Sequence, residues 1–279
     1  MDGSMGSARA VRSKPFAVAA AAAALLLLFA LVPGCSGSRR SAVEQAEGGA
    51  RAEGDGAGEE AVPPEEGGGA AGGVPRFDPA RETVIKRGNP DRMEVTLTID
   101  DGWNRDDRIL DLLQSQGIRC TVFVVGGRGV AESNPDWVAR MDRMGWEVCT
   151  HTYDHYKLTD HPYEYVVEDI RKGQEVIAAV TGKTYPYMRP SGGSYNDTVV
   201  QACRDCSCYL VMWSNSLGDT DQGATVDGEV AAVLNNLKNG DIILSHFGGH
   251  HTYEALSRLI PEIKRRGYRF VTLTELLSP

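Results

Sequence analysis

Short apolar runs rich in β-branched residues alternate with helix-like stretches over most of the chain after residue 94. The expected strands are Val95–Ile99, Cys120–Val125, Trp146–Thr150, Cys208–Trp213, Asp241–His246 and Tyr268–Leu273. Apolar residues at helical spacing predict helices over Asp106–Ser115, Tyr163–Val180, Val226–Leu237 and Tyr253–Arg266. Strands that alternate with helices indicate parallel βα units. About seven such units predict an α/β fold, a distorted (β/α) barrel whose functional residues gather at the carboxyl ends of its strands.

The first 35 residues have the features of an export leader. Basic residues precede an uncharged apolar run from Phe16 to Val32, and small residues lead to Cys35. A basic region, an apolar run and small residues before a cleavage point predict a secretory signal. The position of Cys35 after Gly34 resembles the lipidation site of bacterial lipoproteins, and an uncleaved apolar anchor is the alternative. Both readings place the remaining chain outside the cytoplasm and hold it to a membrane.

Residues 36–80 are rich in Gly, Ala and Glu and contain almost no large apolar side chain. Such a segment cannot bury enough apolar surface to offset the entropy of ordering, so we expect a disordered linker. The remaining segment, 81–279, carries all six His and all four Trp and is the expected folded domain. Its 22 Lys+Arg against 28 Asp+Glu give a net charge of −6 without a basic stripe, which argues against a nucleic-acid partner.

Two polar motifs follow apolar runs and supply the ligand types of a catalytic metal site. Asp100 and Asp101 end the first expected strand, and His151 and His155 come just after another. One Asp and two His leave coordination positions open, which is the pattern of a catalytic rather than a structural zinc ion. The remaining carboxylate can act as a general base beside the metal. Taken singly, the Asp pair before Gly102 reads as a turn and the His pair as an ordinary helix or loop face; the combination is far more specific.

Cysteines in the folded segment allow more than one reading. Cys120 and Cys149 lie in apolar runs and are expected to be buried thiols. Cys203, Cys206 and Cys208 lie close together in sequence. A disulfide or free thiols explain them better than a second metal site, because no second ligand pair lies nearby.

An ordered set of motifs extends over nearly all of the expected folded domain. The motifs read TLTIDDGWN, TVFVVGG, THTYDH, MRPSGGSYND, VMWSNSLGD, DIILSHFGG and the closing YEALSRLIPEIKRRGYRFVTLTELL. Taken together, from about Glu94 to Leu277, they resemble the polysaccharide deacetylases of the chitin-oligosaccharide deacetylase type, carbohydrate esterase family 4. Each piece alone is weak, whereas the ordered set is highly specific.

The resemblance implies a role for each polar residue of the first three motifs. Asp100 would be the general base. Asp101, His151 and His155 would hold one divalent metal ion, with Zn2+ as the first candidate. Arg189 would orient the base carboxylate, because a neighbouring Arg lowers the pKa of a carboxyl group and therefore cannot make it more basic.

The later motifs depart in part from the family pattern. The family often continues Arg-Pro with Pro-Tyr-Gly, whereas this chain has two glycines; the backbone N–H of Gly192 remains to bind the substrate's carbonyl oxygen. Trp213 is expected as a pocket wall, with core packing as the alternative, and Asp219 as the residue that orients and charges the catalytic His. Leu244 would line the acetyl methyl pocket. His246 would be the general acid, with a buried structural His as the alternative.

These roles together predict an extracytoplasmic metal-dependent enzyme that removes acetyl groups from N-acetylated amino sugars of a polysaccharide. Peptidoglycan is the first substrate candidate, because the protein would be tethered near it. One alternative is a metal-dependent amidase acting on a small cyclic or linear amide. Another is a degenerate homologue that only binds glycan. The weakened fourth motif favours the degenerate homologue, whereas the complete ligand set, Asp100 and His246 argue against it.

Overall fold

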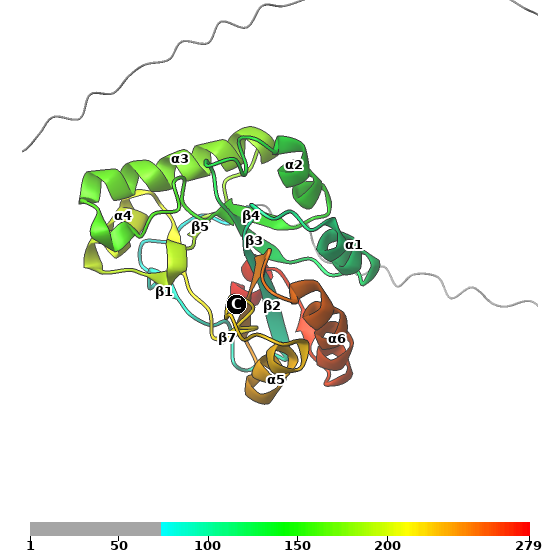
Figure 1. Ribbon diagram of the computed structural model, residues 1–279. Coiled ribbons are helices and arrows are strands. Elements are labelled where there is room, and N and C mark those ends of the chain that lie inside the picture. Colours follow the sequence, from blue (N-terminus) through cyan, green and yellow to red (C-terminus); the bar gives the residue numbers. More distant parts are fainter. Residues whose placement is uncertain (1–73) are drawn as a thin grey trace, which may run out of the picture. The chain divides into compact units, whose positions relative to one another are not determined.

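The computed structural model describes residues 74–279, which form a curved parallel sheet covered by helices (Figure 1). The strands are β1 (Val84–Ile85), β2 (Glu94–Asp101), β3 (Thr121–Val124), β4 (Glu147–Thr150), β5 (Tyr187–Met188), β6 (Tyr209–Val211), β7 (Asn215–Ser216), β8 (Asp241–Phe247) and β9 (Arg269–Phe270). The helices are α1 (Asp107–Ser115), α2 (Pro135–Arg143), α3 (Tyr163–Thr181), α4 (Asp197–Asp205), α5 (Val226–Asn236), α6 (Thr252–Arg265) and α7 (Leu273–Leu277).

All pairings between these strands are parallel, in the order β1-β6-β5-β4-β3-β2-β8-β7, with β9 added beside β2. Strands β1 and β7 therefore end the sheet, and the barrel is open between them. Helices α5 and α6 lie together beside β7 and β8, while α3 lies along the other side near β4 (Figure 1). The predicted distorted barrel of parallel βα units is confirmed.

Side chains from alternate positions of the strands enter two different apolar layers. Along β8, Ile243 and Phe247 join the layer beneath the helices, whereas Ile242 packs inside the barrel with Phe123 and Val211. This alternation follows from the two-residue period of a strand. Because a barrel interior is filled by side chains, chemistry is confined to the rim where the strands end.

Predicted and observed elements differ where a segment is short. The four predicted helices and five of the six predicted strands are found within two residues of their expected bounds. Helices α2 and α4 were not predicted, although both bury residues at helical spacing: Trp137, Val138 and Met141 in α2, and Val199, Ala202 and Cys203 in α4. The predicted strand Tyr268–Leu273 is wrong in its second half. There, a capping box between Thr272 and Glu275 starts α7 at Leu273.

The described chain makes ordered contacts just before the predicted boundary at residue 81. The ring of Phe77 packs against Tyr209 with centroids 4.8 Å apart. The backbone N–H of Asp78 donates to the Tyr209 hydroxyl at 2.9 Å. The predicted leader 1–35 with its lipidation site Cys35, and the predicted linker up to residue 73, lie outside the described residues. Within residues 74–279, no helix is long and apolar enough to cross a membrane.

The cysteines of the described segment are buried free thiols. Cys208 donates its S–H to the carbonyl oxygen of Cys203 at 3.5 Å, and Cys206 donates to Val167 at 3.7 Å. Burial raises the pKa of Cys120 and Cys149 well above the ordinary value of a thiol. The free-thiol reading of the Cys203–Cys208 cluster therefore describes this part of the chain better than a disulfide or a metal site.

Candidate active site

The strand register brings residues distant in sequence to one rim of the barrel. Asp100 pairs with His246 across β2 and β8, and Thr150 pairs with Met188 across β4 and β5. His151 and Arg189 therefore leave their strands side by side, at the same end of the sheet as Asp100. Parallel strands make this convergence unavoidable, since all their carboxyl ends face one way.

Asp101, His151 and His155 bring three ligand atoms together. The Nε2 atoms of the two imidazoles are 3.3 Å apart, and Asp101 Oδ1 lies 3.5 Å from that of His151 and 3.4 Å from that of His155. Ligands about 2.0–2.1 Å from a tetrahedral zinc ion are separated by roughly 3.3–3.4 Å. The three side chains thus already have the spacing that a small divalent cation requires.

The protonation states around this cluster favour a cation at its centre. His151 Nδ1 donates to the carbonyl oxygen of Arg189 at 2.8 Å, which directs the lone pair of Nε2 at the cluster. Burial and the neighbouring His151 lower the pKa of His155 to about 4, so its imidazole is neutral at pH 7. Burial raises the pKa of Asp101 from its ordinary value. A bound cation would relieve this penalty and keep the carboxylate ionised.

Strained backbone holds two of these ligands. Asp101 and His155 have φ angles of 78° and 57°, in the left-handed region that non-glycine residues rarely occupy. Thr152, also left-handed at φ 68°, accepts the backbone N–H of His155 through its hydroxyl at 3.0 Å. Asp169 fixes the same loop by accepting two backbone N–H groups. Strain maintained by specific hydrogen bonds is characteristic of functional sites.

A buried arginine orients Asp100, the other aspartate of the pair. Arg189, which is fully buried, donates from Nη1 to Asp100 Oδ1 at 2.7 Å and to the Thr98 hydroxyl at 2.9 Å. Its other nitrogens donate to the carbonyl oxygens of Val211 and Met212, where the chain leaves β6. One oxygen of Asp100 is therefore held in place. The other lies 3.7 Å from His151 Nε2, facing the cluster.

A carboxylate–imidazole pair, Asp219 and His246, lies at the β8 side of the cluster. His246 Nδ1 donates to Asp219 Oδ1 at 2.8 Å, while Asp219 Oδ2 accepts the backbone N–H of His246 at 2.8 Å and the Thr252 hydroxyl at 2.7 Å. Burial lowers the pKa of His246, but the Asp219 hydrogen bond and the charges of Asp100 and Asp219 outweigh burial, so the net shift is upward. The arrangement favours a protonated imidazole.

The predicted substrate-binding residues lie around these groups. Gly192 occupies the turn Ser191–Gly193 with φ 58°, and open space surrounds its Cα, so its backbone conformation rather than crowding favours glycine. Gly193 abuts Trp213; a Cβ there would come within 2.6 Å of the indole. Leu244 lies two residues before His246, on the same face of β8. The structure therefore brings every predicted site residue to the same end of the barrel.

Sequence reasoning assigned no role to three residues that the structure places at the site. Thr98 shares Nη1 of Arg189 with Asp100, and Thr252 binds Asp219. The indole of Trp103 lies edge-on to the His155 ring at 4.9 Å and is 43% exposed. A Trp two residues after the aspartate pair was a usable signal for a rim position. Thr252, by contrast, had no signal in the sequence.

Comparisons with known proteins agree with this geometry. The family model described as polysaccharide deacetylase matches residues 87–211. A peptidoglycan-N-acetylglucosamine deacetylase of Bacillus cereus is 33% identical over 189 residues, which cover 66% of this chain and 87% of that protein. A solved peptidoglycan N-acetylglucosamine deacetylase, in complex with an N-hydroxybenzamide compound, superposes with a TM-score of 0.66 and 29% identity over 70% of this chain and 92% of its own.

A pseudoenzyme also belongs among the solved relatives. The wild-type Bacillus anthracis protein, described as a carbohydrate esterase family 4 pseudoenzyme, is 27% identical with a TM-score of 0.66 over 70% of this chain and 69% of its own. A mutant of that protein is described as having restored enzymatic activity. Active and inactive relatives thus resemble this chain equally well in fold and have similar sequence identity to it. On the evidence of the matched model, the sequence relatives and the solved structures, this chain belongs to the polysaccharide deacetylase family.

Proposed function

We propose that this protein is a metal-dependent deacetylase that removes acetyl groups from N-acetylated amino sugars of a cell-envelope polysaccharide. One observation carries the proposal. Two hydrogen-bonded side-chain pairs, Asp100–Arg189 and His246–Asp219, lie around one cluster of three candidate metal ligands. Relatives named as peptidoglycan deacetylases make peptidoglycan the first substrate candidate.

Each proposed step uses a group whose position is defined. Asp101, His151 and His155 would hold a divalent cation, which would supply Lewis-acid polarisation of the acetamide carbonyl and of water. Asp100 accepts a proton from the attacking water through the oxygen that Arg189 leaves free.

Breakdown of the tetrahedral intermediate requires a donor for its oxyanion and an acid for its amine. The Gly192 backbone N–H is the proposed oxyanion donor. His246 then protonates the departing amine through Nε2, while Asp219 holds Nδ1. Leu244 and Trp213 are the proposed walls for the acetyl group and the sugar. Acetate and an amino sugar leave.

Exposed aromatic residues beside the cluster support a polymeric substrate over a small amide. Trp103 and Tyr156, both nearly half exposed, are two of the few large apolar side chains on the described surface. Trp103 contacts the His155 ring, and the Arg128 guanidinium lies 4.8 Å above the Tyr156 ring. An exposed aromatic ring beside a reaction centre offers an apolar surface on which a ligand can pack. A sugar chain with its apolar faces is the ligand these rings suit.

Acetate release from defined glycans tests the function directly. We expect purified peptidoglycan and N-acetylglucosamine oligomers to release acetate, and chelation of the metal to abolish release. The Asp100→Asn protein is the matched control for background hydrolysis. Metal content without acetate release from any glycan would favour an amidase on a small amide, and absence of metal would favour a glycan-binding homologue.

We further propose that the protein is extracytoplasmic and held to a membrane through lipid on Cys35. The apolar run and small residues before Cys35 support this assignment. Labelled fatty acid should enter the wild-type protein and not Cys35→Ala. An unlabelled wild-type protein that remains in the membrane fraction would instead favour an uncleaved anchor at Phe16–Val32.

A further inference from the structure

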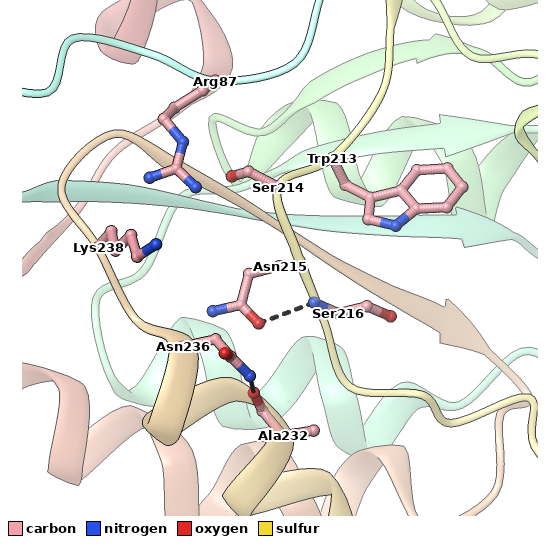
Figure 2. Close-up of a pocket in the computed structure, with 8 residues that line it drawn as sticks. All are labelled: Arg87, Trp213, Ser214, Asn215, Ser216, Ala232, Asn236 and Lys238. Carbon is pink, nitrogen blue, oxygen red and sulfur yellow. Dashed lines mark hydrogen bonds between the residues drawn. The ribbon is translucent and has the colours of Figure 1, made fainter.

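The open side of the barrel, between the ends of its sheet at β1 and β7, contains a cavity of about 430 Å³. We call it the seam pocket. Figure 2 shows Arg87 and Lys238 at one end, Trp213 at the other, and the polar side chains of Ser214, Asn215 and Asn236 between them. The volume is within the range of about 300–1,000 Å³ typical of small-molecule sites. Apart from Trp213, no residue that lines this cavity has a role in the proposed reaction.

The charged end of the seam pocket carries more positive than negative charge. Arg87 pairs with fully buried Asp241 at 2.9 Å. Asp241 also accepts the Ser214 hydroxyl at 2.7 Å, the Asn215 amide at 3.3 Å and the backbone N–H of Lys238 at 2.8 Å. Within residues 74–279, no carboxylate lies within 4.0 Å of the Lys238 ammonium. One carboxylate therefore balances two cations.

Hydrogen-bond donors in this end also outnumber acceptors. Both oxygens of Asp241 are already engaged by the contacts above. The Arg87 guanidinium uses one nitrogen on Asp241, which leaves other N–H groups for a ligand. Lys238 adds a further cationic donor. A ligand with anionic oxygens matches this surplus of charge and donors.

The aromatic end connects the seam pocket to the reaction centre. In Figure 2, Trp213 lies on the side to which β2 and β8 point, the side of the catalytic rim. The guanidinium carbon of Arg189, which holds Asp100, is 5.7 Å from the Trp213 ring centroid. Gly193, next to the proposed oxyanion donor, abuts the same indole. One aromatic ring thus borders both the reaction centre and the seam pocket.

We propose that the seam pocket binds the acidic substituent of a sugar adjacent to the one being deacetylated. The sugar ring would lie against Trp213, and a carboxylate on its side arm would reach Arg87 and Lys238. This inference rests on the proposed function and narrows its substrate class to glycans that carry carboxylate arms, of which muramic-type sugars are one. A neutral polymer of N-acetylglucosamine has no group for the charged end.

Steady-state kinetics of the full-length protein test the assignment. Lys238→Gln removes the unpaired cation and keeps the backbone N–H that Asp241 accepts. We expect a roughly threefold to tenfold higher KM for an oligosaccharide containing N-acetylmuramic acid, which is the size of the net contribution of one ordinary hydrogen bond, with kcat unchanged. The KM for a neutral N-acetylglucosamine oligomer should not change. The matched control is Lys172→Gln, on α3, where the lysine pairs with Glu168. Equal effects on both substrates, or none on either, would overturn the proposal.

Direct binding separates a failure of the pocket from a failure of the enzyme assignment. By calorimetry, N-acetylmuramic acid should bind the full-length protein more tightly than N-acetylglucosamine, and Lys238→Gln should remove that preference. A preference without acetate release from any glycan would refute the deacetylase function and retain the acidic-sugar site. Acetate release without the preference would refute the site alone. Binding of inorganic phosphate but not of the acidic sugar would identify a free-anion site and overturn the proposal.

Discussion

Two buried aspartates, Asp100 and Asp219, have opposite proposed tasks because their partners differ. Asp100 receives the guanidinium of Arg189 on one oxygen and turns the other toward the metal cluster. Both carboxylate oxygens of Asp219 accept hydrogen bonds, from His246 on β8 and from the Thr252 hydroxyl. The first carboxylate can still accept a proton from water. Asp219 has no free oxygen and can act only through the imidazole of His246 that it holds.

The substitution Asp100→Asn should retain the metal and the fold and lose most of the turnover. The amide is close in shape to the carboxylate but cannot accept a proton, so general-base assistance of about 10²–10⁴-fold disappears. Acetate release by the metal-loaded variant measures the effect. Near wild-type turnover would remove Asp100 from the mechanism.

The substitution Asp219→Asn should move the alkaline limb of the pH–rate profile toward acid. Asp219 stabilises protonated His246, so its loss lowers the pKa of the imidazole, and the general acid is deprotonated at lower pH. The pH dependence of kcat/KM reports this shift. An alkaline limb unchanged in position would show that a group other than His246 controls it.

The exposed indole of Trp103 should contribute to polymer binding and not to chemistry. Trp103→Ala is expected to raise KM for a polymeric glycan several-fold, since stacking on an aromatic ring contributes roughly 0.5–1.5 kcal/mol. The kcat should be retained, because the indole packs against the His155 ring and donates to the Arg128 carbonyl oxygen but supplies no ligand atom. A loss of bound metal in this variant would instead assign Trp103 to support of the ligand.

At the scale of elements, α5 contains a carboxyl group with unusual surroundings. Glu229 is 2% exposed, and neither of its carboxyl oxygens has a hydrogen-bond partner within residues 74–279. Burial, with the charges of Asp219 and Glu254, raises the pKa of Glu229 to about 7. A buried group left unpaired in this way normally destabilises the element that carries it.

The raised pKa of Glu229 gives a pH-dependent stability with a definite sign. Folding favours the protonated carboxyl, so this contribution is complete below the unfolded value of 4.5 and is lost as pH rises through about 7. Glu229→Gln, which does not titrate, should unfold like wild type at pH ~4 and be more stable at pH ~8 by on the order of 1–3 kcal/mol. Denaturant unfolding at both pH values checks this. An equal change at both would point to a packing effect.

At the scale of the whole described segment, contacts before the predicted boundary at residue 81 matter for stability. A fragment 74–279 contains every proposed catalytic group and should fold and release acetate. A fragment 81–279 lacks Phe77 and should be less stable by about 1–3 kcal/mol, because it loses the burial of an aromatic ring against Tyr209. Circular dichroism melts compare the two fragments. Equal melting would show that residues 74–80 do not contribute.

The parallel barrel and most of the site could be predicted from local pattern. Strand and helix periods are local properties, so five strands and four helices matched closely, while two-residue strands carried too little pattern. His151 and His155 lie on one loop, and their spacing together with the Asp pair indicated a shared ligand role. Cysteine spacing, by contrast, did not decide between bonded and free thiols, because that depends on where each sulfur lies in three dimensions.

The sequence by itself determined the residue types of the candidate metal cluster and of the proposed base and acid, because the ordered motifs carry them. Only the tertiary structure decided which side chains contact and orient one another. Arg189 reaches Asp100 across 89 positions of chain, and His246 reaches Asp219 across 27. The seam pocket exists because β1 and β7 end the sheet without closing it. Such contacts depend on strand register and on the route of the chain, which no local pattern specifies.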